Sequence, residues 1–198
     1  MASIKLKHSG GNSVSLNPPS SAPTSSDVAF KLPNADGSAN QVIKTDGSGN
    51  LAFAGYAEPP SFKAYMGSQQ VLATGTNTAM VVDTEVFDSN SFFNTSDYKF
   101  TPTIAGYYFI NANLEYSNST GNYVFTSHIY KNGSIALRGT VWNDGSNTNV
   151  NTQISGILAF NGSSDYAQVY GYQNSGGNIT IYAGAHSSYF EAFYLRGL

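Results

Sequence analysis

The sequence predicts an all-β protein, and three observations carry this prediction. From residue 61 onward, apolar and aromatic residues come in short runs that alternate with polar residues at a period of two, which is the spacing of a half-buried strand. Asn-Gly, Asp-Gly and Ser-Gly pairs, which favour tight turns, separate these runs. No stretch keeps the i, i+3, i+4, i+7 spacing of an amphipathic helix for a useful length. Many short strands at even spacing are typical of a β-sandwich or barrel.

The 198 residues fall into two unlike parts. Six of the seven prolines lie in the first sixty residues, whereas 24 of the 27 aromatic residues lie from residue 61 onward. Residues 1–57 are rich in Ser, Gly, Asn and Pro and carry too little apolar mass to build a core. We therefore predict an extended arm over residues 1–57, which is disordered in isolation and orders on contact with other chains, and one folded domain over residues 58–198.

Short β-elements are expected within the arm, because its apolar residues recur at strand spacing in Ile4/Leu6, Val14/Leu16 and Val28/Phe30/Leu32. A repeat places Asp-Gly in both Asn34–Asn40 and Lys44–Asn50, and each pair predicts a tight turn that closes a small hairpin. The second copy also resembles the start of a calcium loop. Counted from Asp46 as the first position of such a loop, the sixth and twelfth positions are Leu51 and Ala57, where a calcium loop needs Gly and Glu, so we interpret both copies as turns.

The strands of the folded domain follow the apolar runs, and we predict them at residues 61–66, 79–87, 97–101, 106–116, 123–131, 134–142, 150–160, 165–173, 178–183 and 187–195. The alternation is clearest in 106–116, where one face carries Tyr108, Ile110, Ala112, Leu114 and Tyr116. Asn132-Gly133 between two of these runs predicts a hairpin with a type I′ turn, because both positions tolerate positive φ.

The domain resembles a known family. Phe100-Thr-Pro-Thr-Ile-Ala-Gly-Tyr-Tyr-Phe109 is similar to the F-x-P and G-x-Y signature of the complement C1q globular head, in the superfamily of jelly rolls like tumour necrosis factor. The Lys-Asn-Gly hairpin and the closing strand from Ser188 agree with this likeness. Ser164-Asp165 stands where the family has Gly-Asp, and Ala192 replaces a glycine of the last strand.

This resemblance covers about residues 61–198. It implies a ten-stranded jelly roll that assembles as a homotrimer, with aromatic residues packed along the threefold axis. Surplus aromatic residues often mark an interface. The alternative is that they are ordinary strand-formers in a two-faced sheet.

The arm resembles a different group of proteins. The segment from Phe30 to Phe53 is similar to the LP-x-x-DGS-x-x-QVL-x-TDGSGNL segment of tail-fibre and related appendage proteins of bacterial viruses. The resemblance implies a virion protein that is assembled in the host cytoplasm and that binds other virion proteins through its arm. The start of the chain, MASIKLKHSGGNS, has no apolar run of signal-peptide length, which agrees with this expectation.

Composition removes several classes of partner and chemistry. The net charge of −3 provides no basic field for nucleic acid or for anionic lipid. No segment approaches the roughly 18–20 apolar residues of a membrane span, so membrane insertion is not expected. The absence of cysteine excludes disulfides, a thiol nucleophile and thiolate metal sites.

Catalysis finds little support in the sequence. The histidines His8, His128 and His186 are scattered without metal-binding spacing, and no G-x-S-x-G motif frames a serine beside a base. Asp83 and Glu85 form a carboxylate pair that could act on a glycosidic bond, but we interpret both as solvated. We therefore predict no enzyme activity, no cofactor and no metal, and we name no site residue.

The leading hypothesis is a trimeric structural protein of a bacteriophage particle, either a tail fibre or a capsid fibre, that attaches to a glycan or protein receptor on the host surface. Polar loops at residues 117–122, 143–149 and 174–178 suit weak, multivalent saccharide binding. Two alternatives stay open: a secreted or cell-surface recognition module of a cellular organism, and a small depolymerase with a carboxylate pair in a groove.

Overall fold

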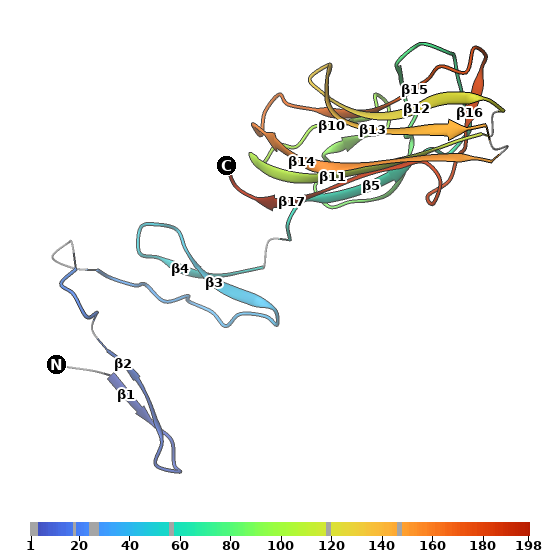
Figure 1. Ribbon diagram of the computed structural model, residues 1–198. Coiled ribbons are helices and arrows are strands. Elements are labelled where there is room, and N and C mark those ends of the chain that lie inside the picture. The colour runs from blue at the N-terminus through green and yellow to red at the C-terminus, as the bar shows by residue number, and fades with distance from the viewer. Residues whose placement is uncertain (1–3, 18, 24–27, 56–57, 118–119, 146–147) are drawn as a thin grey trace. The chain divides into compact units, whose positions relative to one another are not determined.

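The computed structural model describes the chain except for residues 1–3, 18, 24–27, 56–57, 118–119 and 146–147. Its contacts divide the chain into two compact units, Met1–Ala57 and Glu58–Leu198 (Figure 1). Every regular element among the described residues is a β-strand, so the all-β prediction is confirmed. Accordingly, the described part contains no helix that is long and apolar enough to cross a membrane.

The first unit consists of two small antiparallel hairpins. One pairs β1 (Ile4–Lys7) with β2 (Ser13–Leu16), and the other pairs β3 (Gln41–Thr45) with β4 (Leu51–Gly55). The second hairpin is closed by the predicted Asp-Gly turn, in which Asp46 Oδ1 accepts hydrogen bonds from the backbone N–H of Ser48 at 2.8 Å and of Asn50 at 3.1 Å. Asp46 therefore organises a turn, as we interpreted it.

The first Asp-Gly pair closes no hairpin, so that prediction is wrong. Its segment instead runs beside the second hairpin, where Lys31 forms a parallel bridge with Asn50. Gly37 lies against the ring of Phe53, which a Cβ at this position would approach to 2.6 Å. Contact with β4 has replaced the local pairing that the repeat suggested.

The second unit contains thirteen strands in its described residues, against the ten that the resemblance implies: β5 (Ser61–Tyr65), β6 (Gln70–Leu72), β7 (Thr78–Ala79), β8 (Thr84–Asp88), β9 (Phe93–Asn94), β10 (Lys99–Phe100), β11 (Gly106–Tyr116), β12 (Asn122–Lys131), β13 (Ser134–Asp144), β14 (Val150–Phe160), β15 (Ala167–Gln173), β16 (Ile179–Ile181) and β17 (Tyr189–Arg196). The extra strands are short pieces such as β6, β7 and β9.

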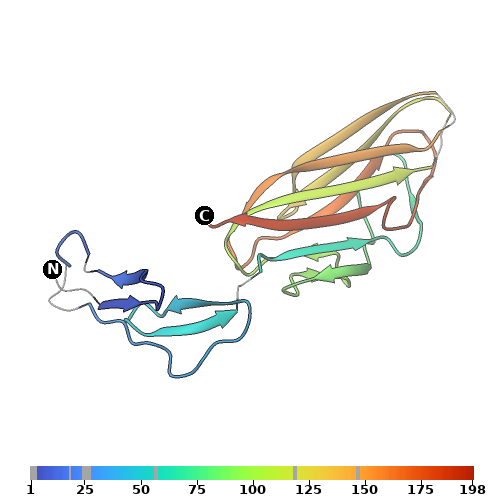
Figure 2. The same cartoon turned by 90° about the horizontal axis from the view of Figure 1, so that it is seen from below.

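These strands form a two-layered sandwich. One layer, which we call the β12 sheet, has the order β13-β12-β15-β10-β9 with β7 beside β15. The other, the β11 sheet, has the order β6-β16-β11-β17-β5-β8 with β14 beside β11. Figure 2 shows the C-terminal strand β17 between β5 and β11 in the β11 sheet.

The single strand predicted at residues 79–87 is broken in two. Met80 N–H still bonds to Val169 O of the β12 sheet at 2.9 Å, whereas β8 pairs with β5 of the β11 sheet. The chain therefore crosses from one layer to the other between β7 and β8. Met80 and Val82 are both buried, each 1% exposed, where the chain crosses the core. Because they are two residues apart, their spacing resembles that of a strand.

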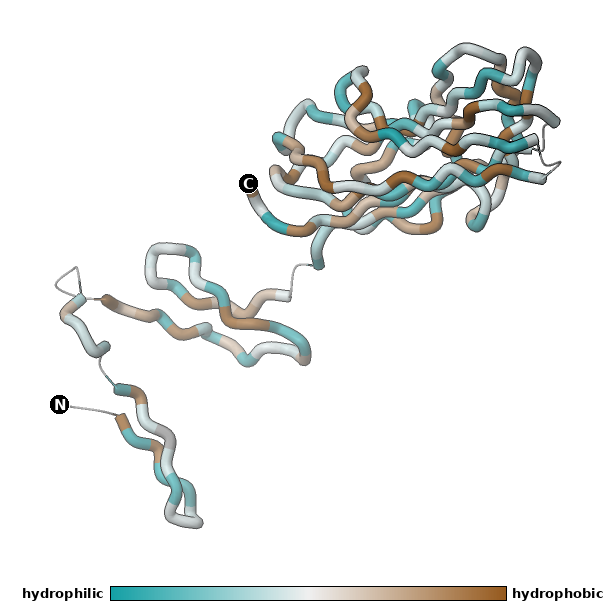
Figure 3. The backbone as a smooth tube through the Cα atoms, in the orientation of Figure 1, coloured by the Kyte–Doolittle hydropathy of each residue, from teal (hydrophilic) through white to brown (hydrophobic). Residues whose placement is uncertain are grey.

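Aromatic side chains fill the core between the layers. The Phe62 ring stacks on Phe93 and on Phe100, with centroid distances of 4.7 Å in both cases. Gly106 leaves room for β17, since a Cβ there would lie 2.6 Å from Arg196 O. Many of the aromatic residues of this unit therefore belong to its core. Figure 3 shows that apolar and polar positions alternate along the strands.

Candidate binding site

Strand β12 presents two different faces. Phe125 and Ile129 point into the core and are fully buried. Thr126 and His128 alternate with them and therefore face outward from the sandwich. Each is nonetheless only 3% exposed, because side chains of the neighbouring strands surround it. Two buried polar residues on an outer face indicate a recess in the sheet surface.

This recess is a pocket of about 320 Å³, which we call the Arg138 pocket. Val124 and six polar residues line it: Asn77, Thr126, His128, Arg138, Thr140 and Tyr172. Small-ligand pockets begin at roughly 300 Å³. None of the lining residues is Asp or Glu, so Arg138 makes the pocket positive within a chain whose net charge is −3.

A β-bulge brings the key residues of the pocket together. The predicted Asn132-Gly133 turn joins β12 to β13, with the positive φ values of 52° and 78° that the prediction required. The register then shifts between Ile129 and Tyr130, so that His128 pairs with Arg138. Without this shift His128 would face residue 137, and Arg138 would belong to the opposite face of the sheet.

His128 and Arg138 are directly bonded. Arg138 donates a hydrogen bond of 3.1 Å from Nε to His128 Nε2. Because Nε2 accepts, the neutral ring carries its proton on Nδ1, and Nδ1 is buried without a partner among the described residues. Burial, and secondarily the charge of Arg138, lower the pKa of His128 below its ordinary value. Leaving such a buried donor unpaired costs about 1–3 kcal/mol.

Aromatic side chains flank the Arg138 pocket. Trp142 pairs across the strands with Val124, so it lies on the same sheet face, and it is 71% exposed. Tyr130 and Tyr170 stack with ring centroids 4.0 Å apart, and the Tyr130 ring meets His128 edge-on. The pocket thus combines hydroxyl, amide and guanidinium groups with an exposed indole at its border.

The loops that the sequence singled out are held by structural bonds where they are described. The loop at 174–178 is organised by the buried Gln173 side chain, whose Nε2 donates to Leu72 O at 3.1 Å and to Gly177 O at 2.8 Å. Parts of the other two predicted loops, residues 118–119 and 146–147, lie outside the described residues. The Arg138 pocket lies instead on a sheet face, where the sequence did not predict a binding site.

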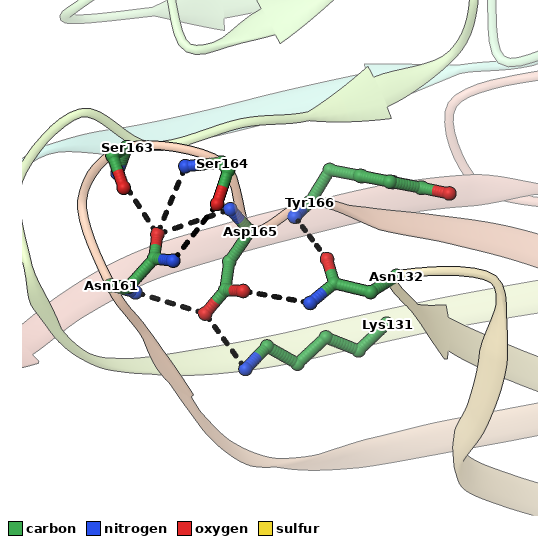
Figure 4. Close-up of polar contacts among 7 residues, drawn as sticks. All are labelled: Lys131, Asn132, Asn161, Ser163, Ser164, Asp165 and Tyr166. Atoms are coloured by element: carbon green, nitrogen blue, oxygen red, sulfur yellow. Dashed lines mark hydrogen bonds and ion pairs between the residues drawn. The ribbon is translucent and has the colours of Figure 1, made fainter.

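A further polar network, around Asp165, ties two loops together (Figure 4). The Asp165 carboxylate accepts hydrogen bonds from the Asn132 side-chain amide at 2.7 Å and from Asn161 N–H at 3.0 Å, and it lies 2.9 Å from the ammonium of Lys131. These bonds lower the pKa of Asp165, with the Asn132 amide as the largest cause. The network is a structural clamp on the Lys-Asn-Gly hairpin.

The residues weighed for catalysis do not assemble into a site. Ser127 faces the core and donates from Oγ to Thr152 O at 2.9 Å, on the opposite face of β12 from His128. Asp83 and Glu85 are exposed, as the solvated interpretation predicts, but Asp83 lies before β8 and accepts from Gly67 N–H at 2.8 Å. Among the described residues no group of three His, Cys, Asp or Glu is arranged to hold a metal ion.

The outer face of the β11 sheet carries an apolar surface. Phe109 lies between Ile157 and Phe193 in the strand register, and its ring centroid is 5.2 Å from that of Phe193. Ile157 is 57% exposed and Phe193 46% exposed. We call these three residues, with the neighbouring Leu195, the Phe193 patch. Contiguous apolar surface of this kind marks interaction sites.

The first unit has no buried residue in its described part. Large apolar side chains stay exposed in both hairpins and in the segment between them: Ile4, Leu6, Leu16, Val28, Phe30, Leu32, Val42, Ile43 and Phe53. An open cavity of about 600 Å³ lies between the Lys31–Ser38 segment and β4. This unit therefore offers surface for contact but no core of its own.

Comparison with known proteins finds a similarity of fold for the second unit. No protein-family model matches the chain, and no curated protein matches it in sequence. Among solved structures, the globular domain of zebrafish complement 1qA protein superposes with a TM-score of 0.51 at 14% identity, over 71% of this chain and 100% of that one.

The Eiger tumour necrosis factor of S. frugiperda gives a TM-score of 0.52 at 9% identity, over 71% of this chain and 96% of that one. Murine APRIL gives 0.53 at 8% identity, over 70% and 100%. At these identities the likeness concerns the fold, and the second unit has the jelly-roll fold of complement C1q and tumour-necrosis-factor domains.

Proposed function

We propose that this chain is a structural attachment protein of a bacteriophage particle, in a tail fibre or a capsid fibre. Three copies assemble through their jelly rolls, residues 1–57 bind other virion proteins, and residues 58–198 form a knob. The knob attaches to the host surface without catalysis, by binding a saccharide, with a protein receptor as the other class of target.

The observation that carries the proposal is the Phe193 patch. Three large apolar side chains, Phe109, Ile157 and Phe193, gather on a sheet face that no other strand layer of the second unit covers. A second copy of the chain is the occupant that we propose, because the C1q-like signature around Phe100–Phe109 implies a homotrimer. Homo-oligomers with closed symmetry are the commonest assemblies that cover such a face.

The first unit supports a docking role for the arm. Its hairpins display apolar residues without a core, and such segments gain stability by lying on another protein. The likeness of Phe30–Phe53 to appendage proteins of bacterial viruses gives the class of partner. Docking of three arms on one particle would also multiply weak contacts at the knob into useful avidity.

The Arg138 pocket supports saccharide binding. Thr126, Thr140 and Asn77 supply hydroxyl and amide groups for sugar hydroxyls. The exposed Trp142, which pairs across the strands with the lining residue Val124, offers a flat apolar surface on the same sheet face. The pocket has no carboxylate, whereas hydrolysis of a glycosidic bond ordinarily needs two. This composition favours binding without cleavage.

The proposal is tested in three steps. Sedimentation equilibrium of the full chain at micromolar concentration should give three times the chain mass of 21.1 kDa, and a monomer would contradict the assembly. Mass spectrometry of purified particles should then detect the chain, and its absence from them would contradict the virion role. Mutation of Trp142 to Ala should reduce adsorption of the trimer to host cells.

A secreted or cell-surface recognition module is the second candidate. The solved structures named above, from zebrafish, S. frugiperda and mouse, favour it, because they share the fold of the second unit. A trimer that is found in the medium of the producing cells and never in particles would support this candidate over the first.

A further inference from the structure

We infer that the Arg138 pocket binds a sugar that carries a carboxylate, such as a uronic acid residue. This inference rests on the proposed function, because it names the class of saccharide that the knob would take. It assigns the carboxylate to Arg138 and the sugar hydroxyls to the neutral polar groups of the same pocket.

The charge of Arg138 is uncompensated. Arg138 takes part in none of the ion pairs Lys63–Glu191, Lys99–Asp97 and Lys131–Asp165 of the described residues. No acidic residue lines the pocket. A guanidinium at a pocket without a carboxylate of its own is complementary to an anionic ligand.

The bond to His128 orients this guanidinium for a planar anion. Arg138 uses Nε to donate to His128 Nε2 at 3.1 Å. Its four other N–H groups are on Nη1 and Nη2, which together match the two oxygens of a carboxylate in a bidentate pair. His128 is 3% exposed and fixed in the floor of the pocket, so the arginine is held by a rigid partner.

The remaining lining groups suit a sugar ring better than a simple anion. The hydroxyls of Thr126 and Thr140 lie 3.3 Å apart and can both donate and accept. The pocket volume of about 320 Å³ exceeds what a free carboxylate or phosphate needs. A sugar ring with one carboxylate can bind Arg138 through the carboxylate and both threonines through its hydroxyls at the same time.

The test compares glucuronate with glucose, which carries a hydroxymethyl group where glucuronate has its carboxylate. Binding of each to the full chain is measured by isothermal titration or by ligand-detected NMR at low salt. We expect glucuronate to bind about tenfold more tightly than glucose. The preference should shrink as salt rises, because Arg138 is exposed to solvent.

Arg138→Gln should weaken glucuronate binding about tenfold and so abolish the preference for glucuronate over glucose. Arg138→Lys should lie between the two, since lysine keeps the charge but loses the bidentate geometry. The matched control is Arg196→Gln in β17 of the β11 sheet, which removes the same charge far from the pocket in the strand order. Thermal unfolding of each variant establishes that it is folded.

Three results would overturn the inference: equal affinity for glucose and glucuronate, equal loss in Arg138→Gln and Arg196→Gln, or displacement of glucuronate by equimolar acetate or inorganic phosphate. Failure here is distinct from failure of the proposed function. A trimer found on particles that binds only neutral host glycans would refute the uronate inference and keep the attachment role. Glucuronate binding through Arg138 by a protein that is absent from particles would keep the uronate inference and refute the virion role.

Discussion

Asn132 and Asp165, 33 residues apart in the sequence, bond to each other directly, with 2.7 Å between Asn132 Nδ2 and Asp165 Oδ1. Asn132 Oδ1 in turn accepts from Tyr166 N–H at 3.0 Å. The hairpin turn that joins β12 to β13 is thereby fastened to the loop before β15. Asp165 therefore holds the Lys-Asn-Gly turn in place through the side chain of Asn132.

Loss of this clamp should destabilise the second unit. Asp165→Ala removes three partners from a carboxylate that is 14% exposed, so we expect a loss of about 1–3 kcal/mol in the free energy of unfolding. Glu85→Ala, which removes an exposed carboxylate on β8, should change it by less than about 0.5 kcal/mol. Urea unfolding followed by circular dichroism measures both, and equal stabilities would contradict the clamp.

Local signals explain what could be predicted of this fold. The residue alternation at period two predicts the long strands β11, β12 and β14, and Asn132-Gly133 predicts the turn between β12 and β13. Both signals lie in residues that are neighbours in the sequence, so they are sufficient to predict these elements. The break between β7 and β8 was missed because Met80 and Val82 stay buried at strand spacing while the chain changes layers. The spacing of apolar residues in the sequence does not tell which of the two sheets a buried residue belongs to.

The Arg138 pocket was missed for a related reason. Its residues come from β12, β13, β15 and the segment before β7, and only the pairing of these strands brings them together. The tight turn alone would have paired His128 with residue 137. The register shift between Ile129 and Tyr130 brings Arg138 there, and neither residue period nor turn chemistry predicts such a shift.

His128 should make the protein sensitive to mild acid. Its pKa is lowered in the folded state by burial and by Arg138, whereas in the unfolded chain it is ordinary, about 6.5. The unfolded state therefore binds the proton first, and stability should fall as pH drops below about 6.5 towards the folded pKa.

His128→Gln should abolish this part of the pH dependence, while His186→Gln, at an exposed position, should preserve it. Unfolding midpoints in urea between pH 7.5 and 5 measure the effect. NMR titration of the imidazole protons gives the pKa independently, and a His128 pKa at or above 6.5 would refute the prediction.

Gly139 of β13 should be intolerant of a side chain. A Cβ at this position would lie 2.4 Å from Gln153 O in β14, a backbone atom that cannot move alone. Gly139→Ala should therefore separate the edges of the two layers and lower the melting temperature, with a cost of about 1–3 kcal/mol.

The matched control is Gly177→Ala, because a Cβ there has no neighbour within 4 Å. Calorimetry of the two variants gives the comparison. A Gly139→Ala protein as stable as Gly177→Ala would mean that β13 and β14 are not in close contact.

Assembly should depend on the Phe193 patch. Ile157→Asp places a charge among exposed apolar residues of the β11 sheet, and burying that charge in an interface would oppose association. We expect the trimer to dissociate to monomer in sedimentation experiments. Ile135→Asp makes the same change at a 42% exposed position of the β12 sheet and should leave the trimer intact. Dissociation by both variants, or by neither, would move the interface away from this patch.

The arm should be the first part of the free protein to be cut by trypsin. Lys31 and Lys44 are exposed in a unit without buried residues, where local opening costs little free energy. Lys99 and Lys131 are instead half-buried beside their ion-pair partners in the second unit. Brief digestion should yield a stable fragment that begins at Thr45, identified by mass spectrometry. Cleavage after Lys99 as fast as after Lys44 would contradict the prediction that the arm is cut first. If the arm docks on the particle, Lys44 should resist trypsin in the particle-bound protein. The urea-unfolded chain is the control and should be cut at every lysine.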